Sequence, residues 1–280
     1  LSGCGGESES SAPSELIIQG GGEDTKKPAF PVTLSDGTVI ENEPQSAASL
    51  SPAATEIVAE LGYSDKLCAV SRYCDYPQGL VGVTVGSSEN PDMDKLLELA
   101  PDVVFTMSGI AERERYTLNA AGIAVVELSA PENVLDYVQL YKNVGTAFGG
   151  ESEGAAAGEK ASAALASAAE GIKLGSFVYV TPKLTAAAGG TFENAVLSLC
   201  GKNICKGQGY ISDAEMLDGT PDYIIAADSL SESDISGNTL FAGMLSAGAK
   251  LVFVPAERFE RPSARIADVF GALRNAVTSE

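Results

Sequence analysis

The 280-residue sequence contains no histidine and no tryptophan. Histidine is the commonest general base and the commonest transition-metal ligand, so its absence removes the usual catalytic triads and most metal sites. Neither a GxSxG nucleophile motif nor a Walker phosphate-binding loop is present, and Gly189-Gly190 is too short for a phosphate-binding fingerprint. The sequence therefore predicts a protein that is not an enzyme and that needs no cofactor or metal of its own.

Positive charge is scarce: 18 Lys and Arg residues stand against 38 Asp and Glu residues, for a formal net charge of -20. Such a field repels phosphate backbones, which excludes nucleic acid as a partner. No run reaches the roughly 18 apolar residues that a membrane-spanning helix needs. Hydrophobic residues make up 45% of the chain and charged residues 20%, a balance typical of a globular protein. The length allows two domains.

The first four residues, Leu1-Ser2-Gly3-Cys4, have the pattern of a lipobox, in which the cysteine receives a diacylglyceryl group. The segment that follows, 5–22, is rich in Gly, Ser and Glu, as expected of a flexible tether. We therefore predict that residues 1–28 are a lipoprotein anchor and tether that hold the protein at the outer face of the cell membrane. The alternative is a chance occurrence of LSGC.

The other cysteines are Cys68, Cys74, Cys200 and Cys205. Disulfides persist outside the cytoplasm, and the two members of each pair are close in sequence. The favoured pairing is therefore Cys68 with Cys74 and Cys200 with Cys205. A four-cysteine zinc site is an alternative, although the spacings are looser than in known zinc sites, and free buried thiols are another.

Short apolar strands alternate with helical segments along most of the chain, which predicts mostly parallel sheets. A β-hairpin is predicted at 28–40, and strands at 46–50, 66–70, 103–106, 124–128, 177–181, 223–228 and 250–255. Helices are predicted at 54–62, 92–101, 111–122, 192–201 and 265–277.

The segment 134–172 is rich in alanine, the best helix former, and predicts one long helix between the two halves. The predicted fold is therefore α/β, with two Rossmann-like lobes joined by a long backbone helix and a ligand cleft between them. The predicted domains are an N-terminal lobe at 29–140, an interlobe helix at 141–174 and a C-terminal lobe at 175–280.

Three segments resemble the helical-backbone class of substrate-binding proteins of ABC importers for iron-siderophores, haem and vitamin B12. They are SLSPAATEIVAELG (49–62) with VSRYCDYP (70–77), LLELAPDVVFT (96–106) with AAGIAVVEL (120–128), and AERFERPSARIAD (256–268). The resemblance implies an extracytoplasmic lipoprotein, a monomer, that delivers a metal chelate or a corrinoid to a membrane permease. The iron or cobalt would belong to the ligand. The alternative is a sensory or adhesion lipoprotein that retains the binding fold.

Candidate ligand-binding residues follow the predicted strands, at the sheet edge where ligands of open α/β sheets collect. Arg72 and Tyr73 lie in the loop after the second strand and offer a cation and a stacking ring. Three arginines within eight residues, Arg258, Arg261 and Arg265, are unusual in so acidic a chain, and one or two of them are predicted to clamp the ligand; the alternative is a solvated face. The resemblance implies, by position, that five residues line the ligand: Tyr73, Met107, Tyr210, Glu257 and Arg261.

The sequence departs from the vitamin B12-binding pattern at two positions. Ser88 and Met107 stand where that pattern has tryptophan, so stacking of a corrinoid on these positions is lost. Arg72, Arg113 and Arg115 add positive charge near the same edge, which favours an anionic metal chelate.

The resemblance also implies an acidic docking residue for the permease on each lobe. Asp94 or Glu98 would serve on the first lobe and Glu193 on the second. In an acidic chain, the alternative for each is a solvated carboxylate. The long helix is expected to limit closure of the lobes to a small hinge movement.

Overall fold

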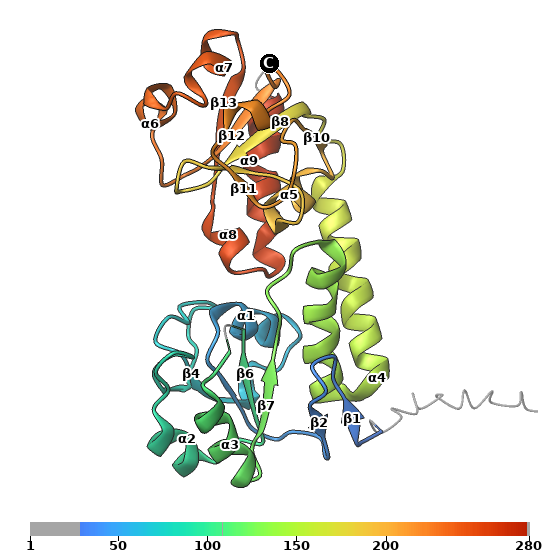
Figure 1. The fold of residues 1–280 in the computed structure, drawn as a ribbon. Helices are drawn as coiled ribbons and strands as arrows, with labels where there is room; N and C mark the ends of the chain where they lie inside the picture. The colour runs from blue at the N-terminus through green and yellow to red at the C-terminus, as the bar shows by residue number, and fades with distance from the viewer. Residues whose placement is uncertain (1–28, 108, 279–280) are drawn as a thin grey trace, which may run out of the picture.

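A computed structural model describes residues 29–107 and 109–278. The predicted anchor and tether, including Cys4, lie outside these residues. The described chain forms two α/β lobes connected by the helical element α4 (Val134–Ala169), as Figure 1 shows. The predicted fold class, two lobes with mostly parallel sheets joined by a long helix, is confirmed. No helix in the described ranges is long and apolar enough to cross a membrane.

The N-terminal lobe follows a strand–helix alternation. Its elements are β3 (Ala47–Ser49), α1 (Pro52–Glu60), η1 (Ser64–Lys66), β4 (Leu67–Val70), β5 (Val83–Thr84), α2 (Met93–Leu99), β6 (Val103–Thr106), α3 (Glu112–Ala120) and β7 (Ala124–Glu127). The five strands are parallel, in the order β5-β4-β3-β6-β7. All residues of β3 and β6 are buried, as expected where helices cover both faces of a parallel sheet.

Helix α1 begins where its sequence places a capping residue next to a proline. Ser51 is the N-cap, and its Oγ accepts a hydrogen bond from Ala54 N at 3.4 Å. Pro52 occupies the first helical position, where its missing N–H costs nothing. Because Ser51 follows β3 directly, α1 starts at the carboxyl edge of the sheet.

A small hairpin precedes this lobe. Strands β1 (Val32–Thr33) and β2 (Val39–Ile40) pair antiparallel, as predicted, around a turn in which Gly37 has φ of 86°. The hairpin is tied to α4, because the Asn143 side chain donates to Ser35 Oγ at 2.6 Å and accepts from Ser35 N at 3.3 Å.

The connecting element α4 turns back on itself at Gly150. There the backbone has φ of 79° and ψ of -179°, a region that glycine alone occupies readily. The two arms of α4 lie side by side in Figure 1 and pack closely through glycine. A Cβ added at Gly145 would lie 2.9 Å from Ala157 Cβ. The predicted helix is thus a hairpin of two helical arms, and glycines that weaken a straight helix permit this packing.

The C-terminal lobe contains the remaining elements. They are β8 (Gly175–Val180), β9 (Ala186–Ala187), α5 (Phe192–Leu197), β10 (Gly201–Asn203), β11 (Tyr210–Ile211), η2 (Ala214–Met216), β12 (Tyr223–Ala227), α6 (Glu232–Gly237), α7 (Ala242–Ser246), β13 (Lys250–Val254), α8 (Glu257–Glu260), η3 (Ala264–Ile266) and α9 (Ala267–Thr278). The sheet order is β11-β9-β8-β12-β13, with β10 also pairing with β8. The long strands are parallel, and β9 runs antiparallel to β8 and β11.

The predicted disulfides are wrong, because all four cysteines in the described part of the chain are free thiols. The pairs Cys68 with Cys74 and Cys200 with Cys205 do not form, since the thiols face separate neighbours. Of these four thiols only Cys200 is buried, and the other three are partly exposed. Cys68 Sγ donates to Ala47 O at 3.3 Å, Cys74 Sγ lies 3.0 Å from Thr55 Oγ1, Cys200 Sγ donates to Ala169 O at 3.8 Å, and Cys205 packs in the core of the C-terminal lobe.

The glycine contact within α4 gives a stability prediction. In Gly154→Ala, the new Cβ would lie 2.8 Å from Lys142 O and 3.0 Å from Thr146 Cβ, so the two arms must separate. We expect a loss of about 1–3 kcal/mol in the free energy of unfolding, measured by urea denaturation. The control is Gly271→Ala in α9, where nothing lies within 4 Å of the new Cβ. Equal stabilities of the two variants would contradict close packing of the arms.

Candidate functional site

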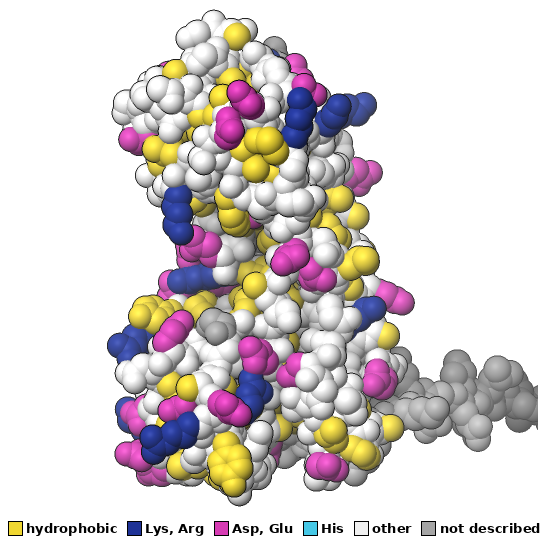
Figure 2. All heavy atoms as spheres, viewed as in Figure 1, with side chains coloured by type: hydrophobic (Ala, Val, Ile, Leu, Met, Phe, Trp, Pro, Cys, Tyr) yellow, Lys and Arg dark blue, Asp and Glu magenta, His cyan; other side chains and the backbone are white. Residues whose placement is uncertain are grey.

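The carboxyl edges of the two sheets face each other across the space between the lobes. In Figure 1, α1 lies on the side of the N-terminal lobe that faces α8, at the nearest part of the C-terminal lobe. Contact between the lobes is made by residues 261–266, which we call the junction segment. Figure 2 shows an indentation of the surface between the lobes, with acidic and basic side chains gathered at it.

A buried carboxylate joins the junction segment to α1. Glu56 is 1% exposed, and it accepts hydrogen bonds from Ser263 Oγ at 2.6 Å and from Arg265 Nη1 at 2.9 Å. Arg265 also lies over the ring of Tyr76, 4.4 Å from its centroid. Because an unpaired carboxylate at this depth would cost several kcal/mol, the lobes are held together here.

One turn further along α1, Glu60 extends the same contact. It accepts hydrogen bonds from Ala264 N at 3.1 Å and from Tyr141 Oη at 2.5 Å, so α1, α4 and the junction segment meet at one carboxylate. Tyr137 Oη donates to Tyr141 Oη at 3.3 Å. Burial raises the pKa of Glu60 above its ordinary value of 4.5, despite these hydrogen bonds.

The arginines predicted to clamp a ligand are all paired with carboxylates. Arg261 Nη1 lies 2.5 Å from Asp75 Oδ1, across the lobes, and 2.9 Å from Glu257 Oε1. Arg258 Nε donates to Asp268 Oδ2 at 2.8 Å, within its own lobe. The structure thus brings Arg261 and Arg265 to the interface between the lobes, whereas Arg258 is turned toward α9.

Two of the predicted aromatic ligand residues are exposed, one on each lobe. Tyr73 and Tyr210 are each 56% exposed, one from the loop after β4 and the other from β11. Tyr210 Oη donates to Glu193 Oε1 at 3.1 Å. Burial, followed by the charges of Glu193 and Glu260, raises the pKa of Tyr210 to about 12. The C-terminal lobe therefore carries a hydrogen-bonded Tyr–Glu pair.

The last two predicted ligand residues belong to the N-terminal lobe. Arg72 is exposed and lines a hollow together with Asp92 and Lys95, whose side chains form an ion pair at 3.0 Å. Met107 is partly buried and packs against the core. Ser88 is 5% exposed, so it offers a ligand little surface.

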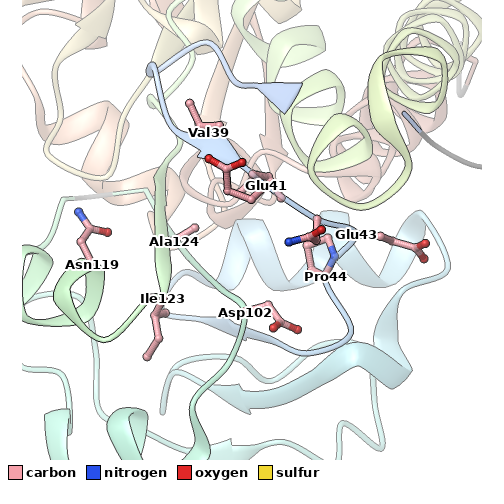
Figure 3. A pocket seen from close by; sticks show the side chains of 11 residues that line it. Val39, Glu41, Glu43, Pro44, Asp102, Asn119, Ile123 and Ala124 are labelled. Atoms are coloured by element: carbon pink, nitrogen blue, oxygen red, sulfur yellow. The ribbon is translucent and has the colours of Figure 1, made fainter. Parts of the chain in front are cut away.

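A second hollow lies at the opposite edge of the N-terminal sheet. Figure 3 shows its lining, which includes Glu41, Glu43 and Asp102. The Asp102 carboxylate is already used, since its Oδ2 accepts hydrogen bonds from Gln45 N and Ser46 N, both at 2.8 Å. This hollow is separated from the junction by the length of the strands, and we do not assign it to ligand binding.

A protein-family model matches this chain across most of the two lobes. Residues 48–243 match the family described as periplasmic binding protein. This chain belongs to the periplasmic binding protein family. The family consists of extracytoplasmic solute-binding proteins and is not a class of enzymes.

Relatives of this periplasmic binding protein agree with that membership. The Uncharacterized ABC transporter substrate-binding lipoprotein YvrC of Bacillus subtilis is 30% identical over 136 residues, which are 46% of this chain and 43% of YvrC. The matched segment thus spans less than half the length of that curated relative.

Solved structures show the same fold. The periplasmic vitamin B12 binding protein BtuF of Vibrio cholerae has a TM-score of 0.61 and 22% identity, and the match covers 84% of this chain and 97% of BtuF. A periplasmic heme binding protein from Pseudomonas aeruginosa also has a TM-score of 0.61 and 22% identity, over 83% and 92% of the two chains.

The predicted docking residues of this periplasmic binding protein differ in their surroundings. Asp94 and Glu98 are exposed on α2. Glu193 is partly buried in the first turn of α5, accepts from Tyr210, and has a pKa raised by burial. Its carboxylate is therefore engaged within its own lobe. A docking role for the three residues stays a prediction.

The residues missed from the sequence are those that join the lobes: Glu56, Glu60, Ser263 and Asp75. A signal for the first two was present. Glu56 and Glu60 lie four residues apart in an otherwise apolar helix, so they share one face, and a carboxylate on a buried face requires a partner. The partners themselves lie more than 200 residues away in sequence and could not be identified.

Removing the buried carboxylate tests the junction. Glu56→Ala leaves Arg265 and Ser263 without their acceptor, and we expect the free energy of unfolding in urea to fall by about 2–3 kcal/mol. This is below the range for a fully buried pair, because Arg265 is 20% exposed and retains some hydration. The control is Glu98→Ala on the exposed face of α2. A loss no larger than the control would show that the lobes do not depend on this contact.

Glu60 gives a pH prediction. The pKa of Glu60 is raised in the folded chain, so the folded chain keeps a proton that the unfolded chain releases near pH 4.5. The contribution of Glu60 to the free energy of unfolding therefore falls as the pH rises from 4.5 through the raised pKa. Glu60→Gln removes this dependence. The stability of the variant minus that of the wild type should therefore increase between pH 4.5 and pH 7, in chemical denaturation at each pH. A difference that is flat with pH would contradict the shifted pKa of Glu60.

Proposed function

We propose that this chain is the substrate-binding component of an ABC importer, which captures a metal chelate or a corrinoid between its lobes and delivers it to a membrane permease. The observation that carries the proposal is the opposition of the two sheet edges (Figure 1), and each lobe adds an exposed tyrosine, Tyr73 or Tyr210, that we propose contacts the ligand. Flat, metal-bearing ligands suit a site that offers aromatic rings for stacking. Membership of the periplasmic binding protein family supports it.

The names of the relatives support the same proposal. YvrC is named as an ABC transporter substrate-binding lipoprotein, and the structural neighbours are named for vitamin B12 and heme. The LSGC sequence at residues 1–4 supports attachment to the outer face of the membrane through a lipid on Cys4. Asp94 or Glu98, together with Glu193, remain the proposed contacts with the permease.

The proposed mode of binding is a small closure of a stiff clamp. The lobes are linked covalently through the two arms of α4 and noncovalently through Glu56 and the junction segment. A large opening would have to break the buried contact of Glu56. Small-angle scattering with and without ligand should therefore show nearly the same radius of gyration.

A ligand screen tests the proposed function. Thermal-shift and titration experiments with cyanocobalamin, ferrioxamine B, haemin and ferric enterobactin should identify at least one ligand that binds with one-to-one stoichiometry. Tyr73→Ala should weaken that ligand by about 0.5–1.5 kcal/mol through loss of ring contact. The control is Tyr116→Ala on α3, which is 75% exposed and removes a ring of the same kind. Failure of every probe to bind would count against the transport proposal.

A further inference from the structure

The charge balance at the lobe interface bears on which ligands the cleft accepts. The three arginines predicted to clamp a ligand are paired with four carboxylates, so this cluster carries no positive charge to spare. The pairs are Arg258 with Asp268 and Glu257, Arg261 with Asp75 and Glu257, and Arg265 with Glu56. An anionic ligand that approaches them meets guanidinium groups whose charge is already neutralised.

Displacing one of these carboxylates by an anionic ligand is costly at Arg265. A ligand anion at Arg265 would take the cation from Glu56. The Glu56 carboxylate is 1% exposed, and within the described residues its remaining hydrogen-bond donor would be Ser263. Leaving a buried carboxylate without its cation costs several kcal/mol, more than a new exposed ion pair returns. Arg265 is therefore fixed as a structural residue of the junction.

Displacement is easier at Arg261 but brings little gain. Asp75 is 68% exposed and can move into water, yet Glu257 remains 2.9 Å from Arg261. The ligand anion would then take the place of the Asp75 carboxylate and would lie beside the negative charge of Glu257. Since exposed ion pairs contribute little, no net attraction for an anion results.

The C-terminal lobe carries a second acidic group of side chains, around Tyr210. Tyr210 lies among the carboxylates of Glu193 and Glu260, whose charges add to burial in raising the pKa of its hydroxyl. The field at this exposed ring is thus negative, and its neighbour Glu193 is a hydrogen-bond acceptor. An uncharged or positive group of a ligand, such as an amide N–H or an ammonium, is stabilised there, whereas a carboxylate is repelled.

The cations of the N-terminal lobe do not reverse this balance. Arg115 forms an ion pair with Glu127. Arg72 and Arg113 are exposed, and the structure shows no ion pair for either within the described ranges. A hydrated surface guanidinium attracts an anion weakly and less so in salt.

From this balance we infer that the cleft selects ligands without net negative charge, namely uncharged or cationic corrinoids and metal chelates whose polar groups are amides, and discriminates against polyanionic chelates and carboxylates. The inference rests on the proposed function. It reverses the preference for an anionic chelate that the number of arginines in the sequence had favoured.

Equilibrium titration of the purified chain with probes of different charge tests the inference. Cyanocobalamin is uncharged and ferrioxamine B is cationic, whereas haemin and ferric enterobactin are anionic. Each probe that binds is then compared with a matched acid: a monocarboxylate of cyanocobalamin made by hydrolysing one side-chain amide, or N-succinyl ferrioxamine B. We expect the anionic probes and the matched acids to bind at least tenfold more weakly than the best uncharged or cationic probe.

The outcomes separate the inference from the proposed function. Binding of haemin or ferric enterobactin as tight as that of the best uncharged or cationic probe would overturn the inference and leave the transport function standing. Absence of binding by all four probes would overturn both. A matched acid that binds as well as its parent ligand would also overturn the inference.

A variant tests whether the ion-paired arginine is the cause. Asp75→Asn leaves Arg261 with one carboxylate instead of two, so the ratio of the affinities for the parent ligand and the matched acid should fall about threefold or more. Asp65→Asn removes the same charge from η1, at the opposite end of β4, and should leave the ratio unchanged. Glu257→Gln removes the other partner of Arg261 and provides a second variant if Asp75→Asn binds neither ligand. An unchanged ratio in both variants would contradict this origin of selectivity.

Discussion

The arrangement of the lobes depends on one buried carboxylate. Glu56 lies within α1 at 1% exposure, where its charge would be strongly disfavoured without the hydrogen bonds from Ser263 and Arg265. These partners come from the other lobe, so the stability of the charge and the contact between the lobes are the same physical requirement. Glu60, one turn away, binds the same segment through Ala264 N and reaches α4 through Tyr141. Helix α1 is therefore the surface on which both the C-terminal lobe and the connecting helices rest.

This arrangement determines what remains for a ligand. The junction uses Arg265 and Ser263 as structural groups, while Tyr73 on one lobe and Tyr210 on the other stay exposed. The hairpin shape of α4 adds a second rigid link, because its arms are packed through Gly145 and Gly154 and cannot bend independently. A clamp restrained at two places gains little from closing around its ligand. It must recognise the ligand mainly by the shape and charge of walls that are already in place.

The sequence was sufficient for features that depend on local interactions. The alternation of apolar strands with helices, the Ser51-Pro52 start of α1 and the turn at Gly37 were all predictable, since caps and periodicity act within a few residues. The bend in α4 was not, because a glycine is compatible with helix until tertiary packing selects φ of 79° at Gly150. The disulfide prediction was wrong for a related reason. Closeness in sequence does not orient Cys68 and Cys74, whose thiols point to β3 and α1.

The candidate site also separates what local sequence predicts from what only tertiary contacts determine. The sequence singled out Arg261 and Arg265, which lie at the lobe interface, and Arg258, which does not, but it could not supply the partners, which lie 186 residues away for Arg261 and 209 for Arg265. A count of arginines in an acidic chain therefore indicates where charge is concentrated, not whether any of it is available. Here the protein's own carboxylates occupy the guanidinium groups. The excess of negative charge thus has a specific consequence between the lobes. Carboxylates of the N-terminal lobe pair with Arg261 and Arg265, which connects the lobes and leaves these arginines less able to bind an anionic ligand.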